Sequence, residues 1–144
     1  MIAPRRECGD CGKCCEGWLH CSVLGHAIYR ERPCFFLHKT CTIYENRPDE
    51  PCKSYECSWL SEDVFPMWMK PNLANIIITK RSFMNKQTNQ FEEYHEILEA
   101  GSIIDSRTLN WLVLWAIRNN RNIYYQVNDV FHKIGSREFL MAAL

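Results

Sequence analysis

The spacing of apolar residues divides the chain into two parts of different character. After position 72, apolar residues recur with the periods of strands and helices, whereas residues 8–57 contain few long periodic runs. Periodic patterns predict elements that bury a common core. The amino-terminal part must gain its order in another way, and cross-linking through metal is the natural candidate. The intervening segment 61–71 is punctuated by prolines and predicts a connecting loop.

The carboxy-terminal part is expected to contain a small sheet. Residues 75–80 carry a β-branched run that is typical of a buried strand. Residues 85–90 are polar and turn-like, and 91–99 predict a second strand, so this stretch is expected to form a hairpin. A third strand is predicted over residues 122–127.

Two helices are expected beside this sheet. Asp105 or Ser106 is a suitable N-cap for a helix whose apolar residues recur at helical spacing to about Asn119. Ser136 can cap a last short helix. The expected fold class is therefore α+β: an irregular, cysteine-rich, metal-bound amino-terminal region packed on a small antiparallel sheet with one long and one short helix. Residues 1–60 form the predicted cysteine-cluster region, and residues 61–144 a small α+β region in one compact domain with it.

Charge and hydropathy narrow the range of partners. The chain has 17 Lys and Arg against 17 Asp and Glu, a formal net charge of zero. A nucleic-acid-binding protein normally shows a basic excess, so no nucleic-acid partner is expected. No run approaches the roughly 18 apolar residues of a membrane span, and the opening residues lack the apolar core of a signal peptide. We expect a cytoplasmic protein without a membrane partner.

The cysteines require a separate explanation. All nine lie between Cys8 and Cys57. A disulfide framework fits poorly, because the number is odd and no export signal is present. Cytosolic thiols stay reduced, and cysteines at this density more often bind metal.

The first cysteine cluster has a spacing that suits metal. A Cys-x2-Cys turn brings two sulfurs onto one metal, and Gly9 and Gly12 suit such turns because glycine accepts positive φ. Adjacent side chains tend to diverge, so a neighbouring pair more easily serves two metals, or two sides of a cluster, than one ion. The cluster consists of Cys8, Cys11, Cys14 and Cys15. One ligand beside one free buried thiol is the alternative for the adjacent pair.

The second cluster is embedded in proline- and aromatic-rich sequence that would stiffen and dry a site. It consists of Cys34, Cys41, Cys52 and Cys57.

Together these motifs resemble the CxxCxxCC cysteine-cluster (YkgJ-type) family, described as zinc- or iron-chelating. The match comprises the leading motif, the stretches Cys34-Phe-Phe-Leu and Cys41-Thr-Ile-Tyr-Glu-Asn-Arg-Pro, and Cys52-Lys-Ser-Tyr-Glu-Cys57. The resemblance covers roughly residues 8–60. It implies metal binding by Cys8, Cys11, Cys14, Cys15, Cys34, Cys41, Cys52 and Cys57.

Several nearby residues have open roles. Cys21 lies outside the eight matching positions and is either a further ligand or a buried thiol. His20, His26 and His38 could each replace a cysteine, although hydrogen bonding is the more common role of a histidine beside a complete sulfur set. Arg47 could donate hydrogen bonds to cluster sulfur, or pair with a nearby carboxylate.

Eight thiolates are the ligand count for two zinc ions with four cysteines each, for two [4Fe–4S] clusters, or for one of each. The cofactor is therefore an iron–sulfur cluster or Zn²⁺, and the repeated x2 spacing leans towards iron–sulfur. Three functions stay open: a module with a structural metal and a protein partner, an electron-transfer or oxidoreductase protein, and an iron or zinc storage or delivery protein. The sequence contains no phosphate loop, nucleophile motif or convincing carboxylate pair, so it assigns no catalytic residues and leaves enzymatic activity open.

Overall fold

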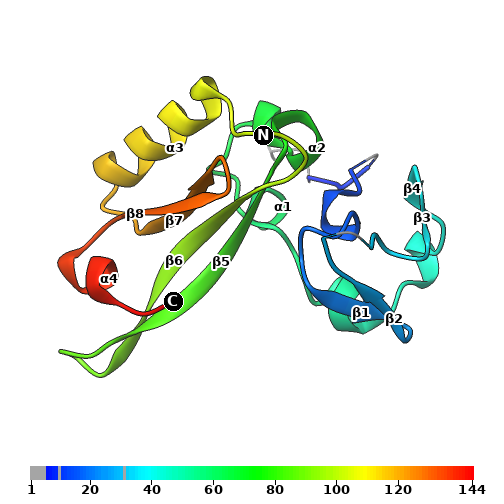
Figure 1. The fold of residues 1–144 in the computed structure, drawn as a ribbon, viewed down its shortest axis with the longest axis horizontal. Helices are drawn as coiled ribbons and strands as arrows, with labels where there is room; N and C mark the ends of the chain where they lie inside the picture. Colours follow the sequence, from blue (N-terminus) through cyan, green and yellow to red (C-terminus); the bar gives the residue numbers. More distant parts are fainter. Residues whose placement is uncertain (1–5, 10, 31) are drawn as a thin grey trace, which may run out of the picture.

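Figure 1 shows a computed structural model that describes residues 6–9, 11–30 and 32–144. Residues 1–5, 10 and 31, which belong to the predicted region 1–60 and include most of the opening segment, lie outside the described residues. The chain has mixed α and β content, as expected for an α+β fold. In the described part of the chain, no helix is long and apolar enough to cross a membrane.

A four-stranded sheet organises the carboxy-terminal part. Its strands, in spatial order, are β5 (Ile76–Asn85), β6 (Gln90–Glu99), β7 (Ile123–Val127) and β8 (Val130–Ile134). The hairpin and the third strand predicted from the sequence are confirmed as β5, β6 and β7. The prediction of an antiparallel sheet is wrong for the central pair, because β6 and β7 run parallel. A helix connects the two strands and returns the chain to the end of the sheet at which β6 begins, as parallel pairing requires.

That connection is α3 (Ser106–Arg118), and both predicted helices are confirmed with their caps. The Asp105 carboxylate accepts the backbone N–H of Thr108 at 2.7 Å, so Asp105 is the N-cap. The hydroxyl of Ser136 accepts the N–H of Phe139 at 3.2 Å and starts α4 (Arg137–Met141).

The main core lies between one face of the sheet, α3 and the segment that precedes β5. Residues 61–71 of this segment were predicted to be a connecting loop, and apart from the turn η4 (Met67–Met69) they are mostly irregular. Two short helices flank them, α1 (Ser58–Ser61) and α2 (Pro71–Ala74). Phe65 and Met69 are completely buried against Leu112 and Trp115 of α3. Their spacing shows no period, so the sequence pattern did not reveal them.

Strand β5 divides its side chains between two neighbours. Ile76 and Ile78 belong to the main core below α3. Ile77 and Thr79 point to the opposite face, because successive side chains of a strand alternate. There Thr79 contacts Tyr55 of the cysteine region. All four residues at the start of β5 are buried, as the continuous apolar run predicted.

The cysteine region, blue to cyan in Figure 1, lies beside β5 and consists of short elements. Its own small core contains Val23, Ile28 and Cys34. The elements are η1 (Lys13–Cys15), β1 (Cys21–Val23), β2 (His26–Ile28), β3 (Leu37–His38), β4 (Thr40–Cys41), η2 (Tyr44–Asn46) and η3 (Asp49–Lys53).

Strand β8 was not predicted, although its turn carries a signal. Asn128 and Asp129 join β7 to β8 with φ values of 53° and 65°. Positive φ at both central residues fits the twist of a hairpin, and Asn and Asp tolerate it. The Glu99 carboxylate, at the end of β6, accepts the N–H groups of Asn128 at 2.9 Å, Asp129 at 2.7 Å and Ile104 at 2.8 Å.

Replacing Glu99 with glutamine is expected to destabilise the protein by about 1–2 kcal/mol at pH 7, because an amide accepts through one oxygen. Burial alone would raise the pKa of Glu99, but the three backbone donors lower it below its ordinary value of 4.5. A depressed pKa stabilises the fold above 4.5, and this stabilisation is lost as the pH falls through the folded-state pKa. The difference between wild type and E99Q in urea denaturation should therefore shrink on acidification. An equal difference at pH 7 and pH 3 would contradict the assignment.

Candidate metal centre

The leading cysteine motif folds into tight turns. The N–H of Cys11 donates to the carbonyl of Cys8 at 2.9 Å, and the N–H of Cys15 donates to the carbonyl of Gly12 at 2.9 Å. Gly9 has a φ of +55°, as a glycine-dependent turn requires. Gly12 has a φ of −122°, so positive φ does not explain it. A Cβ there would lie 3.0 Å from the end of the Leu37 side chain, so glycine lets this side chain pack closely against the turn.

The turns bring the cysteines to the walls of two neighbouring cavities of about 300 and 70 Å³. Four cysteines line both cavities: Cys8, Cys11, Cys14 and Cys52. Cys15, Cys21 and Cys41 line the larger cavity, and Cys57 lines the smaller one. Seven of the eight predicted ligands therefore line these cavities. The eighth, Cys34, is buried behind Cys15 and packs against it.

We divide the thiols into two sets by the neighbours that raise each pKa, and Cys15 also raises the pKa of Cys8 across this division. We call Cys8, Cys11, Cys14 and Cys57 the first thiol group. Burial raises the pKa of the Cys57 thiol to about 11, and the nearby Cys8 and Cys11 contribute to the increase. Burial also raises the pKa of Cys8, followed by the influence of Cys11. The group thus joins the leading motif to a residue at the start of α1.

The second thiol group consists of Cys15, Cys34, Cys41 and Cys52. Burial raises the pKa of Cys52, and Cys15, Cys34, Cys41 and, last, Cys21 raise it further. Burial likewise raises the pKa of Cys34, with further contributions from Cys15 and Cys41. Cys15 ends η1, Cys41 ends β4, Cys52 lies in η3, and Cys34 precedes β3, so the group joins four separate segments of the cysteine region.

Cys14 and Cys15 connect the two groups. Their sulfurs are 3.9 Å apart. A hydrogen bond between them raises the pKa of Cys14 and lowers that of Cys15, so the pair favours one proton on Cys14. The nearby thiols of Cys8 and Cys11 raise the pKa of Cys14 further. Cys15, in contrast, is within hydrogen-bonding reach of Cys34. The adjacent pair thus has one member in each group.

Cys21 and the three histidines differ in their positions. Cys21 lines the larger cavity, and burial, Cys15 and Cys34 raise its pKa, so it lies beside the second thiol group. His20 is exposed at the rim of the same cavity. His26 instead stacks on Phe35 with ring centroids 4.2 Å apart, and His38 lies exposed in β3.

Arg47 is an arginine of the cysteine region that borders both thiol groups. It lines both cavities, and its guanidinium stacks over the Tyr44 ring at 4.1 Å. Its charge partly offsets the increase in the pKa of Cys8, and it adds to the lowering of the pKa of Cys15 by Cys14. The alternative of an ion pair with a nearby carboxylate is absent among the residues that the structure describes.

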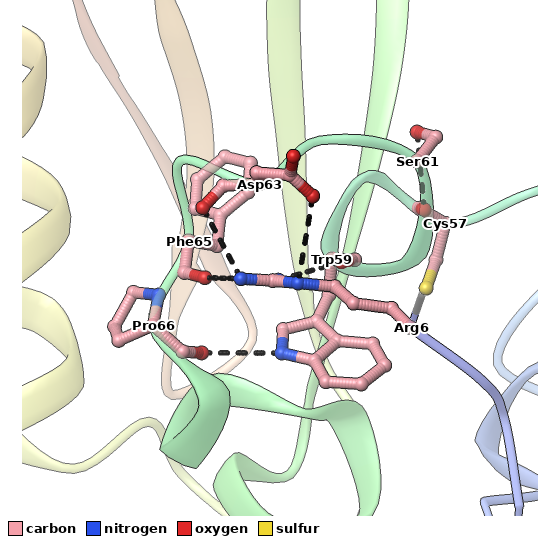
Figure 2. Close-up of polar contacts among 7 residues, drawn as sticks. All are labelled: Arg6, Cys57, Trp59, Ser61, Asp63, Phe65 and Pro66. Atoms are coloured by element: carbon pink, nitrogen blue, oxygen red, sulfur yellow. Dashed lines mark hydrogen bonds and ion pairs between the residues drawn. The ribbon is translucent and has the colours of Figure 1, made fainter. Parts of the chain in front are cut away.

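Arg6 anchors the leading motif to the rest of the fold, as Figure 2 shows. Its guanidinium donates to the carbonyls of Trp59 at 2.7 Å, Asp63 at 3.2 Å and Phe65, and lies 4.9 Å from the centre of the Trp59 ring. Cys57 is the N-cap of α1, two residues before Trp59 (Figure 2). Arg6, two residues before Cys8, therefore ties the start of the leading motif to the segment that carries Cys57. The sequence contained no signal for this role, because the partners lie more than 50 residues away.

Further contacts attach the site to the sheet. The Tyr55 hydroxyl, between Cys52 and Cys57, is hydrogen-bonded to Thr79 at 2.8 Å. Glu62, which follows α1, is hydrogen-bonded to the buried His95 at 2.9 Å and lies 3.5 Å from the Lys80 ammonium group. The cavity walls are otherwise largely apolar, with Leu19, Val23, Ile28, Leu60 and Ile77.

All nine cysteines are free thiols and belong to the described residues. Within residues 6–9, 11–30 and 32–144, no three His, Cys, Asp or Glu side chains converge closely enough to hold a single metal ion. Comparison with protein-family models, curated proteins and solved structures finds no match to this chain. The resemblance to the CxxCxxCC family therefore rests on the cysteine motifs alone.

Proposed function

We propose that this protein is a metal-binding cysteine-cluster protein with two four-thiolate centres. The observation that carries the proposal is the gathering of sulfurs from distant turns around two adjacent cavities with apolar walls. Thiolate sulfur is the ligand that structural zinc and iron–sulfur clusters share. The sulfur donors fit such a group by their chemistry, and the proposal requires the four thiols of each group to draw closer together when metal binds. Membership of the CxxCxxCC family, and a cytoplasmic location in which thiols stay reduced, belong to the same proposal.

Each thiol group would hold one centre. Cys8, Cys11, Cys14 and Cys57 would bind the first, and Cys15, Cys34, Cys41 and Cys52 the second. The division uses each of the eight predicted ligands once and leaves Cys21 outside. It also accounts for the adjacent pair Cys14 and Cys15, whose sulfurs are 3.9 Å apart, because each of the two would bind a different centre.

Iron–sulfur clusters are the leading candidates, with zinc as the alternative. One water needs ~10–15 Å³ of comparable space, so a cavity of about 300 Å³ has room for a multi-atom cluster. When bound, an iron–sulfur cluster supplies reversible one-electron chemistry, whereas an all-cysteine zinc site is structural.

In the proposed role, the metal mainly holds the cysteine region in shape, and the remaining surface serves a protein partner. Most elements of this region are two or three residues long, and such segments seldom fold alone. The 3.9 Å contact between the groups favours electron transfer as the second candidate, because it would place two centres close together.

The test is to purify the protein without oxygen and to measure its absorption spectrum and its iron, sulfide and zinc content. Two [4Fe–4S] clusters predict brown protein that absorbs near 400 nm, with about eight iron and eight sulfide per chain. Cys11→Ser should remove about half of the metal through the first thiol group, and Cys52→Ser about half through the second.

Cys21→Ser is the matched control, because it changes a cavity thiol outside both groups and should retain the full metal content. Colourless protein with two zinc ions per chain would replace the iron–sulfur assignment with the zinc alternative. Protein that binds neither metal after anaerobic reconstitution would contradict the proposal.

A further inference from the structure

Arg47 lies on the walls of both cavities. It directly follows η2, and Pro48 comes next, so the backbone on both sides is constrained. The Tyr44 ring supports one face of the guanidinium at 4.1 Å. Arg47 lines both cavities, together with Cys8 of the first group, and Cys15 of the second group lines the larger one.

This guanidinium lacks a full set of acceptors. The Nε atom of Arg47 is buried without a hydrogen-bond partner in the described part of the chain. The nearby carboxylate of Asp49 lies 3.8 Å from Lys53 instead. A buried donor on a charged group that has no acceptor is strongly destabilising. Such a group in a native protein calls for an acceptor that the protein chain does not supply.

Arg81 provides an internal comparison. It also lines the larger cavity, but its Nε donates to Glu96 at 3.1 Å. Its charge is thus matched within the sheet. Of these two cavity arginines, Arg47 alone has a buried nitrogen that lacks an acceptor among the described residues.

The proposed centres would supply the missing acceptors. Four thiolates around a core of charge +2, whether zinc or [4Fe–4S]²⁺, leave a net charge of about −2 at each centre. Two such anions side by side repel each other in a poorly solvated site. A guanidinium has five N–H donors in a planar fork, which lets it donate to two neighbours at once.

We infer that Arg47 is a positioning residue shared by the two centres, which donates N–H groups to sulfur at both and offsets their negative charge. The inference rests on the proposed function and extends it: the two centres are coupled through one side chain. If the centres are iron–sulfur clusters, Arg47 stabilises the more negative, reduced state of each one. It also slows the loss of metal, since its N–H groups hold the sulfurs of both centres through hydrogen bonds.

The experiment compares Arg47→Gln and Arg47→Lys with the matched control Arg81→Gln, all as anaerobic holoprotein. For iron–sulfur protein, potentiometric titration is followed by absorption. Arg47→Gln should make the reduction of both centres about tenfold less favourable, which is 59 mV for a one-electron couple. Arg47→Lys, which keeps the charge without the fork, should give a smaller shift. Arg81→Gln should match the wild type.

A second measurement applies to either metal. The rate of metal transfer to a chromogenic chelator should rise about tenfold in Arg47→Gln for the metal of both thiol groups, and should not change in Arg81→Gln. If Arg47→Gln does not fold, the same two measurements are made on Arg47→Lys, which should show smaller changes in the same direction.

The outcomes separate the inference from the proposed function. Wild-type protein without metal would overturn both. Metal-loaded wild type with an unchanged Arg47→Gln would overturn the inference alone, and so would a change confined to one centre. Equal effects of Arg47→Gln and Arg81→Gln would mean that any positive charge near the cavity has the same influence. That result would also overturn the inference.

Discussion

Removal of the metal is expected to unfold the cysteine region while the sheet of β5 to β8 stays folded. The free energy of binding at a structural thiolate site is on the order of 10 kcal/mol, which is comparable to the whole stability of a small domain. The cysteine region has only a small core of its own around Val23, Ile28 and Cys34. The sheet and α3 share a larger core that contains no cysteine among its fully buried members.

Amide hydrogen exchange would measure this difference region by region. Metal-loaded protein and protein stripped by a chelator under reducing, anaerobic conditions should differ mainly over β1 to β4 and the turns up to Cys57. Protection in β5, β6 and α3 should persist. Reconstitution should restore the lost protection, which controls for chemical damage. Unchanged protection of β1 and β2 after complete metal loss would show that the metal does not hold this region.

The second large effect is expected for Arg6→Ala, which should lower the free energy of unfolding by about 3 kcal/mol. Hydrogen bonds from a charged donor contribute about 1.5–3 kcal/mol each, and the variant leaves the carbonyls of Trp59 and Phe65 without their donor. It also removes the cation above the Trp59 ring. Guanidinium denaturation of metal-loaded protein, followed by tryptophan fluorescence, would measure the loss.

Arg121→Ala is the control, since Arg121 is exposed in the turn before β7 and its loss should change stability by less than about 0.5 kcal/mol. Arg6→Lys keeps the charge but not the fork of donors, so it should fall between wild type and Arg6→Ala. Because Arg6 ties Cys8 to the neighbourhood of Cys57, Arg6→Ala should also speed metal loss from the first thiol group. A loss of stability equal to that of Arg121→Ala would contradict the anchoring role.

The sequence predicted the elements whose signals are local. The isoleucine run at the start of β5, the cap at Asp105 and the cap at Ser136 each depend on neighbours a few residues away, and each is confirmed. Strand β8 was missed although the Asn128-Asp129 turn marked its start. The parallel pairing of β6 and β7 was also foreseeable, because a strand, a helix and a second strand in succession favour it.

Contacts between distant segments could not be predicted in this way. The burial of Phe65 and Met69 depends on α3, which follows about 40 residues later. The Arg6 contacts span more than 50 residues. The Cys-x2-Cys spacing indicated the chemistry of the site, but the division of the thiols between two groups requires the three-dimensional positions of Cys15 and Cys57. The same positions bring Cys21, which the motif leaves out, to the wall of the larger cavity.

The two-sided packing of β5 bears on the order in which the site is completed. Ribosomes synthesise a chain from its amino terminus, so all nine cysteines emerge before Ile77 and Arg81, which form part of the cavity walls. During that interval the thiols have no strand behind them and are open to solvent on that side. The wall is added when β5 pairs with β6, which follows it in the chain. The nascent protein thus passes through a stage in which its sulfurs are most accessible, and folding of the sheet then closes them in.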